Sequence, residues 1–151
     1  MYEKLQELRA RKAEREGGFT LIELLVVVVI IGILIAIAIP LYLNYQRGAH
    51  DKAAQSDLRA AISAYEQCYT ESNNAYPIDA TGTDHSASYT LTCGTSTENV
   101  KLSDGSHLKY TSAAGTSYQL LSWNTGGHTA TGTPAFKSFS YDSSQGGSVT
   151  P

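Results

Sequence analysis

The sequence predicts an α+β protein in which one long N-terminal α-helix, membrane-embedded in its first half and amphipathic in its second, packs on a small antiparallel β-sheet head. Three observations predict this class: an uncharged run over residues 24–43, a helical apolar period over 44–72, and short alternating segments after residue 88. The net charge of −3 over 151 residues excludes a nucleic-acid binder that relies on bulk positive charge.

The uncharged run is long enough to cross a bilayer. Its twenty residues, 24–43, rise about 1.5 Å each in a helix and therefore span about 30 Å, the thickness of the hydrocarbon core. A chain of this length cannot bury such a segment on every side, so we expect it to enter a membrane. An ordinary signal peptide cleaved near Ala36-Ile37-Ala38 is the alternative, but its apolar stretch is normally shorter, about 7–15 residues.

The helix is expected to continue through residues 44–72 as an amphipathic segment. Apolar side chains recur there at spacings of three and four, while the charged side chains fall elsewhere. Ser72-Asn73-Asn74 and Pro77 predict its end. The apolar stripe comprises Ala54, Leu58, Ala61, Ile62, Tyr65 and Tyr69, and Asp51, Lys52, Gln55, Arg59 and Glu66 lie outside it.

The head is expected to contain three or four antiparallel strands after a loop over residues 73–88. Asp104-Gly105, Ala114-Gly115 and the stretch from Gly126-Gly127 to Pro134 are turn signals between them. Ten tyrosines and one tryptophan suit a sheet that packs one face on a helix. The strand candidates are 89–93, 108–110, 118–123 and 136–141.

The junction before the apolar run resembles the type IV pilin family. The residues that carry the resemblance are Gly18-Phe19-Thr20-Leu21-Ile22-Glu23, followed by an apolar run of the right length. Gly32 and Pro40 also agree with the family pattern. The resemblance is tight over residues 17–45 and loose over 46–76.

The resemblance implies how the chain is processed and assembled. A prepilin peptidase would cut between Gly18 and Phe19, and the new N-terminal Phe19 would be methylated. Glu23 would then neutralise the Phe19 amine of a neighbouring subunit, because an unpaired charge in an apolar bundle is costly. The helix between Gly32 and Pro40 would partly melt in the assembled filament.

The resemblance also sets the order of segments along the chain. Residues 1–18 form a cytoplasmic leader that is removed, 19–43 the transmembrane and polymerisation helix, 44–72 the amphipathic half of the helix, and 73–151 a Ser/Thr/Gly-rich head. The leader, long like those of Gram-positive pilins, carries five basic residues, which hold that end of the span in the cytoplasm. These residues are Lys4, Arg9, Arg11, Lys12 and Arg15.

The two cysteines are expected to form a disulfide between the helix and the first strand candidate. A bridge from Cys68 to Cys93 would stabilise a small exported head by about 3.5 kcal/mol in the chain-entropy model. Two free thiols are the alternative. The four histidines are isolated in the sequence, and no metal, cofactor or catalytic motif is evident, so no enzyme activity is expected. They are His50, His85, His107 and His128.

These features together predict a structural subunit of a type IV pilus. Its expected partners are the membrane, the prepilin peptidase, an inner-membrane assembly platform and further copies of itself in a helical filament; no direct nucleic-acid binding is evident. The precursor would be a single-pass protein of the cytoplasmic membrane and the product an extracellular pilus. The alternatives are a minor pilin or pseudopilin of a secretion or DNA-uptake machine, and a secreted binding domain with an ordinary signal peptide.

Overall fold

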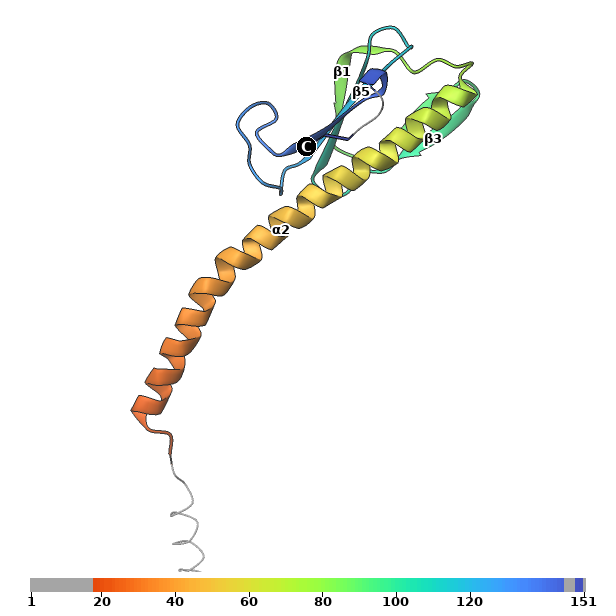
Figure 1. Ribbon diagram of the computed structural model, residues 1–151. Coiled ribbons are helices and arrows are strands. Elements are labelled where there is room, and N and C mark those ends of the chain that lie inside the picture. The colour runs from red at the N-terminus through yellow and green to blue at the C-terminus, as the bar shows by residue number, and fades with distance from the viewer. Residues whose placement is uncertain (1–17, 146–148, 151) are drawn as a thin grey trace, which may run out of the picture. The chain divides into compact units, whose positions relative to one another are not determined.

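The computed structural model describes residues 18–145 and 149–150, so the leader predicted over 1–18 lies, apart from Gly18, outside the described residues. The described chain is one long helix followed by six strands, which confirms the α+β class (Figure 1). It divides into two compact units at Leu41/Tyr42, and each is described by itself. The elements are α2 (Leu21–Glu71), β1 (Asp79–His85), β2 (Tyr89–Cys93), β3 (Ser96–Val100), β4 (Ser106–Ser112), β5 (Gln119–Asn124), β6 (Ser138–Asp142) and the short 3-10 helix η1 (Ser143–Gln145).

The first unit contains the apolar half of α2. Every residue from 18 to 41 is exposed, including the large aliphatic side chains on all sides of the helix. The helix stays α-helical through Gly32 and Pro40, although proline removes one backbone donor there. This single chain therefore contains no melted turn between Gly32 and Pro40, and the melting expected in a filament remains a prediction.

In the second unit, α2 buries one stripe against the head. Ala54, Leu58, Ala61 and Tyr65 are fully or almost fully buried at spacings of four, three and four, as the period predicted. Ile62 and Tyr69 are only half-buried, because they lie at the edges of this stripe. The rest of the stripe comprises Ala64 and Cys68.

Two carboxylates on α2 are buried, which the apolar period did not predict. Asp51 was placed outside the buried stripe, yet only 5% of it is exposed; Asp57 is 8% exposed. Both accept hydrogen bonds from the head. Asp57 accepts from the backbone N–H and the hydroxyl of Ser103, at 2.9 Å each. Burial of these groups is therefore compensated by polar partners distant in sequence.

The strands form two antiparallel sheets where one was expected. The larger has the order β1-β4-β5-β6, and β2 and β3 make a separate hairpin. Alternate residues of the larger sheet face α2 and form the core with the helical stripe, notably Leu108 and Tyr110 on β4, Leu120 on β5 and Phe139 on β6. The two sheets thus share one core with α2.

Two strands lie outside the segments that the sequence predicted as strands. β1 falls within the predicted loop 73–88, and β3 follows β2 after a turn at Gly94, whose φ is +62°. β2 has the predicted bounds, and β4, β5 and β6 begin or end one to two residues away from theirs. At the C-terminal end, Thr150 pairs with Ser140 and extends the larger sheet by one bridge.

Candidate functional site

The predicted processing junction is exposed and lies before the helix. Gly18, Phe19 and Thr20 have no regular secondary structure, and α2 begins at Leu21. Phe19 is 83% exposed, and among the described residues no heavy atom beyond Gly18 and its chain neighbours lies within 4 Å of the position that a Cβ on Gly18 would take. The peptide bond between Gly18 and Phe19 is therefore accessible from solvent, as a protease substrate must be.

Thr20 and Glu23 cap the N-terminus of α2 with a reciprocal pair of hydrogen bonds. The backbone N–H of Thr20 donates to Glu23 Oε2 at 2.8 Å, and the backbone N–H of Glu23 donates to Thr20 Oγ1 at 3.3 Å. The Thr20 hydroxyl also donates to Glu23 Oε2, at 2.7 Å. This arrangement is a capping box, which satisfies two backbone donors that a helix start leaves unpaired.

This cap was not among the predicted features, although its signature is present in the sequence. A Thr followed three residues later by Glu, directly before an apolar run, is the capping-box pattern. Glu23 was interpreted only as the partner of a positive amine. The structure adds a second role, in which the same carboxylate holds the backbone next to Phe19 in place.

The apolar half of α2 has no partner within the described chain. By length and composition, α2 is one helix that can cross a membrane, and no residue of its most apolar window is buried. Isolated exposed apolar residues are normal on a protein surface, but a continuous apolar face of this size marks a membrane or protein interface. The partner of residues 21–43 therefore lies outside the part of the chain that the structure describes.

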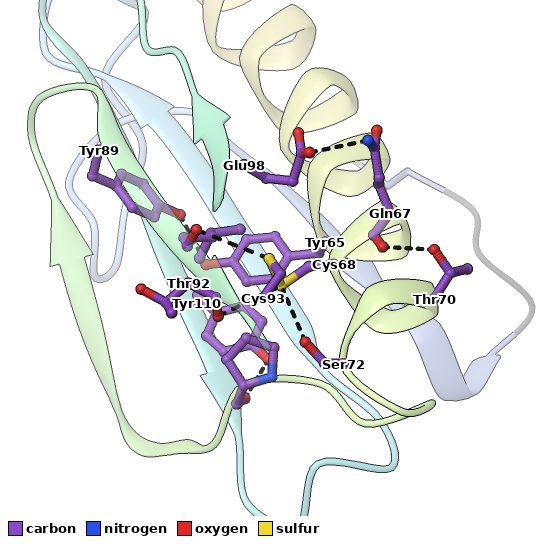
Figure 2. The surroundings of a disulfide bond; sticks show 12 residues. Tyr65, Gln67, Cys68, Thr70, Ser72, Tyr89, Thr92, Cys93, Glu98 and Tyr110 are labelled. Carbon is purple, nitrogen blue, oxygen red and sulfur yellow. Dashed lines mark hydrogen bonds between the residues drawn. A yellow bond between two sulfur atoms is a disulfide. The ribbon is translucent and has the colours of Figure 1, made fainter. Parts of the chain in front are cut away.

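The disulfide joins Cys68 on α2 to Cys93 at the end of β2, which confirms the predicted pair (Figure 2). Both residues are 0% exposed. The bond ties the two-stranded sheet to the helix, beside the ring of Tyr65. Because the sulfurs are inaccessible to solvent, a structural role fits this bond better than a reactive one.

Besides the contact of Asp57 with Ser103, a second buried carboxylate on α2, Asp51, binds the loop after β5. His128 donates its backbone N–H to Asp51 Oδ1 at 3.0 Å, and its Nδ1 lies 2.7 Å from Asp51 Oδ2. The Nε2 of the same ring lies 2.9 Å from Asn44 Oδ1. The sequence context indicated an isolated histidine, but both ring nitrogens of His128 lie within hydrogen-bonding distance of a side-chain oxygen.

Two glycines allow this loop to approach the helix. A Cβ on Gly126 would lie 2.8 Å from His50 Cδ2, and a Cβ on Gly127 would collide with Asp51 Oδ1. The absence of side chains at both positions therefore permits the contact between Asp51 and the loop. The sequence showed this glycine pair only as a turn signal.

The described residues contain no group of three His, Cys, Asp or Glu side chains placed to hold a metal ion. His107 Nδ1 lies 3.1 Å from Asp84 Oδ1, on the face of the larger sheet that points away from the core. In the described part of the chain, neither this pair nor the pair of His128 and Asp51 forms a hydrogen bond with a serine or threonine hydroxyl. The features with a clear functional interpretation are therefore the junction at Gly18, the cap at Glu23 and the apolar helix.

Comparison with known proteins points in the same direction. The family model for the prokaryotic N-terminal methylation motif matches residues 15–39. The type IV major pilin protein PilA of Myxococcus xanthus is 46% identical over 57 residues, which are 38% of this chain and 26% of that protein. The type IV narrow pilus major component PilA5 of Thermus thermophilus is 32% identical over 104 residues, covering 60% of this chain and 90% of PilA5.

A secretion-system protein is also similar. The type II secretion system core protein G of Vibrio cholerae is 32% identical over 114 residues, or 74% of this chain and 75% of that protein. The chain spans about a quarter to a half of the length of the first curated relatives it matches. No solved structure matches the chain.

Proposed function

The chain belongs to the type IV pilin family, and we propose that it is a structural subunit of a type IV pilus. The observation that carries the proposal is the exposed apolar half of α2, which begins directly after a processing motif and has no partner among residues 18–145 and 149–150. A helix of this kind is stored in a membrane before assembly and buried among identical helices afterwards. The proposal assigns the protein no catalytic activity.

The precursor is proposed to span the cytoplasmic membrane once. The leader, residues 1–18, stays in the cytoplasm because its basic residues oppose translocation. Residues 19–43 lie in the bilayer, and residues 44–72 with the head 73–151 lie on the outer side. Inside lipid, α-helical geometry is required because every backbone donor must be satisfied internally, and α2 meets this requirement across Gly32 and Pro40.

Processing is proposed to occur between Gly18 and Phe19, by a prepilin peptidase that acts at the membrane surface. Support comes from the irregular, exposed conformation of this bond, one residue before the cap at Thr20. Cleavage creates a positive amine on Phe19, which is then methylated. The amine forms close to the Glu23 carboxylate, because this carboxylate already accepts a hydrogen bond from the backbone N–H of Thr20, the residue that follows Phe19.

Assembly is proposed to use Glu23 as the counter-charge of the Phe19 amine on a neighbouring subunit. Once the apolar helices pack together, an unpaired amine would cost several kcal/mol per subunit, whereas a paired amine is tolerated. The pairing therefore sets the axial register of an incoming subunit, and an inner-membrane assembly platform delivers it. Local melting between Gly32 and Pro40 would then let the helices adapt to a crowded filament core.

The primary test is the mass of the mature surface protein. We expect a chain that begins at Phe19 and carries one added methyl group on its amine. A mature chain that begins at Ile39 would instead show cleavage of an ordinary signal peptide and leave a secreted binding domain. Intact-protein mass spectrometry distinguishes these outcomes directly.

The role of Glu23 is tested with variants that separate the charge of its carboxylate from its hydrogen bonds to Thr20 at the start of α2. Glu23→Gln removes the charge but keeps an oxygen that can accept the Thr20 N–H, whereas Thr20→Ala removes the hydroxyl and leaves the charge. We expect Glu23→Gln to be processed and inserted normally but to yield few filaments, and Thr20→Ala to assemble. Wild-type filament yield from Glu23→Gln would show that apolar packing alone drives assembly.

A pseudopilin of a secretion machine is the second candidate function. The similarity to the Vibrio cholerae core protein G, over three quarters of its length, favours it. Quantifying the protein in filaments sheared from cells separates the two functions. A major pilin dominates such a preparation, whereas a pseudopilin or minor pilin is scarce in it.

A further inference from the structure

A pocket lined in part by three tyrosines opens in the head, and its lining includes no residue of the processing junction or of the apolar half of α2. Its cavity volume is about 300 Å³, and it lies where α2, β1, β2 and β4 meet. We call it the tyrosine pocket, and the residues that characterise it are Tyr65, Asp79, His85, Tyr89 and Tyr110. Nothing in the proposed pilus function uses it.

The aromatic walls of the pocket are held in place by the fold. The rings of Tyr65 and Tyr110 stack with centroids 4.1 Å apart and an interplanar angle of 4°. The Tyr65 and Tyr89 hydroxyls are hydrogen-bonded at 2.8 Å, and the Tyr110 hydroxyl donates to the Pro77 carbonyl at 2.6 Å (Figure 2). His85 stacks on Tyr89 with ring centroids 3.6 Å apart. Tyr65 and Tyr110 are only 1% and 3% exposed and stack on each other, so the tyrosine ring that a ligand can reach is that of the half-buried Tyr89, which His85 and the Tyr65 hydroxyl hold in place.

The charge of the pocket is negative. Asp79 is the one acidic residue in its lining, and no Lys or Arg lines it within the described part of the chain. Hydrogen bonds from Thr83, Thr81 and Gly82 hold the pKa of the Asp79 carboxyl well below its usual range, so it is ionised at neutral pH. Burial lowers the pKa of His85, so this ring adds no positive charge there.

The tyrosine hydroxyls do not change this charge. Burial raises the pKa of both Tyr89 and Tyr110 to about 12, which keeps both phenols neutral. Four consecutive residues of β2, Tyr89 to Thr92, also line the pocket. Among the described strands β2 pairs with β3 alone, so the backbone carbonyls on its other edge have no partner strand there. The pocket thus combines aromatic rings, one carboxylate and further acceptors.

We propose that the tyrosine pocket binds an alkylammonium group. Aromatic rings attract cations through their quadrupole, and an ionised carboxylate adds Coulomb attraction. An ammonium group also donates hydrogen bonds to carbonyl oxygens such as those on the edge of β2. Phosphates and carboxylates are repelled by Asp79. The ligand is either the primary ammonium group of a lysine side chain of another protein or a small quaternary ammonium ion.

The test is a titration of the full-length chain in uncharged maltoside micelles, followed by NMR. The probes are n-butylammonium, which reproduces the end of a lysine side chain, tetramethylammonium as a quaternary ammonium ion, and 1-butanol as a neutral control. We expect saturable shifts of Asp79 and Tyr89–Thr92 with a Kd on the order of 1–10 mM for the cations only. Tighter binding of n-butylammonium points to a lysine, and tighter binding of tetramethylammonium to a small quaternary ligand.

Variants make the result specific to the pocket. Asp79→Asn and Tyr89→Leu should each weaken binding about fivefold or more. Asp142→Asn is the matched control, because Asp142 also accepts hydrogen bonds from nearby groups, Ser144 and Gln119, but lies outside the pocket. An intact disulfide and unchanged core resonances verify folding. Equal shifts with 1-butanol, no saturable shift, or equal weakening by Asp142→Asn would overturn the proposal.

Discussion

The two halves of α2 contain similar apolar side chains in opposite surroundings. Leu34, in the first half, is 61% exposed, whereas Leu58, in the second half, is completely buried. Burying a leucine stabilises a protein by about 1.5–3 kcal/mol. The second half gains this energy by packing on the head. The first half has no such partner among the residues described, and it can gain the energy from lipid or from other subunits. One continuous helix thus serves folding at one end and association at the other.

Removing the disulfide should have the largest effect on the second half. Replacing Cys68 and Cys93 by Ala together removes the covalent link between α2 and β2, and we expect a loss of about 3.5 kcal/mol in the free energy of unfolding. Denaturant unfolding, followed by the fluorescence of Trp123, measures it. Reducing agent should reproduce the loss in the wild type once the buried bond becomes accessible. A change below about 1 kcal/mol would show that packing alone fixes the hairpin to the helix.

A matched pair of leucine substitutions tests the comparison directly. Leu58→Ala should cost about 3 kcal/mol of unfolding free energy, within the usual range of about 2–5 for a buried leucine. Leu34→Ala should change it by less than about 0.5 kcal/mol, because that side chain is largely exposed. The same denaturant experiment in micelles compares them. Similar losses from the two substitutions would show that the halves are not energetically distinct.

Two Asp-His pairs provide a smaller contrast within the head. The side chain of Asp51 is 8% exposed and that of Asp84 46% exposed, and each contacts a histidine. Asp51→Ala leaves the backbone N–H of His128 without its acceptor and should cost about 1–3 kcal/mol. Asp84→Ala should cost about 0–1 kcal/mol, as for other exposed pairs. Thermal or chemical unfolding of both variants decides whether burial governs the difference.

The smallest expected effect concerns pH and His85. Burial lowers its pKa in the folded state, so the unfolded chain binds the proton more readily. Stability from this group is therefore present above the unfolded pKa of about 6.5 and is lost as the pH falls through the folded pKa. His85→Gln should flatten the dependence of unfolding free energy on pH between 7 and 5. An identical slope in the variant would assign the dependence to other groups.

The parts of the fold that follow local periodicity could be predicted from the sequence. Residues 44–72 show the helical period and end within a residue of α2, and β2 alternates as a half-buried strand does. β1 could not be predicted in this way, because its sequence DATGTDH contains no large apolar residue. It is a strand because it pairs with β4, and Asp79 binds the backbone of its irregular middle.

In the candidate site, too, some features follow from local sequence motifs and others only from contacts between distant residues. The junction at Gly18 and the carboxylate at Glu23 are local motifs, and the cap with Thr20 is a local motif that was overlooked. The contact of Asp51 with His128 joins residues 77 positions apart, so neither residue alone indicated the other. Local patterns predicted the segments, whereas pairings between distant polar groups became visible only in three dimensions.

The bond between Cys68 and Cys93 also determines how the head responds to a pulling force. When the helix and the C-terminus are drawn apart, the force passes through the two sulfurs rather than along the 25 residue steps between them. Fully extended, that segment would lengthen the chain by about 85 Å, at about 3.4 Å per residue. The covalent ring withholds this length, so a stretched head can lengthen only through the residues before Cys68 and after Cys93. A fibre built from such subunits gains a limit to its extensibility that no non-covalent contact in the head supplies.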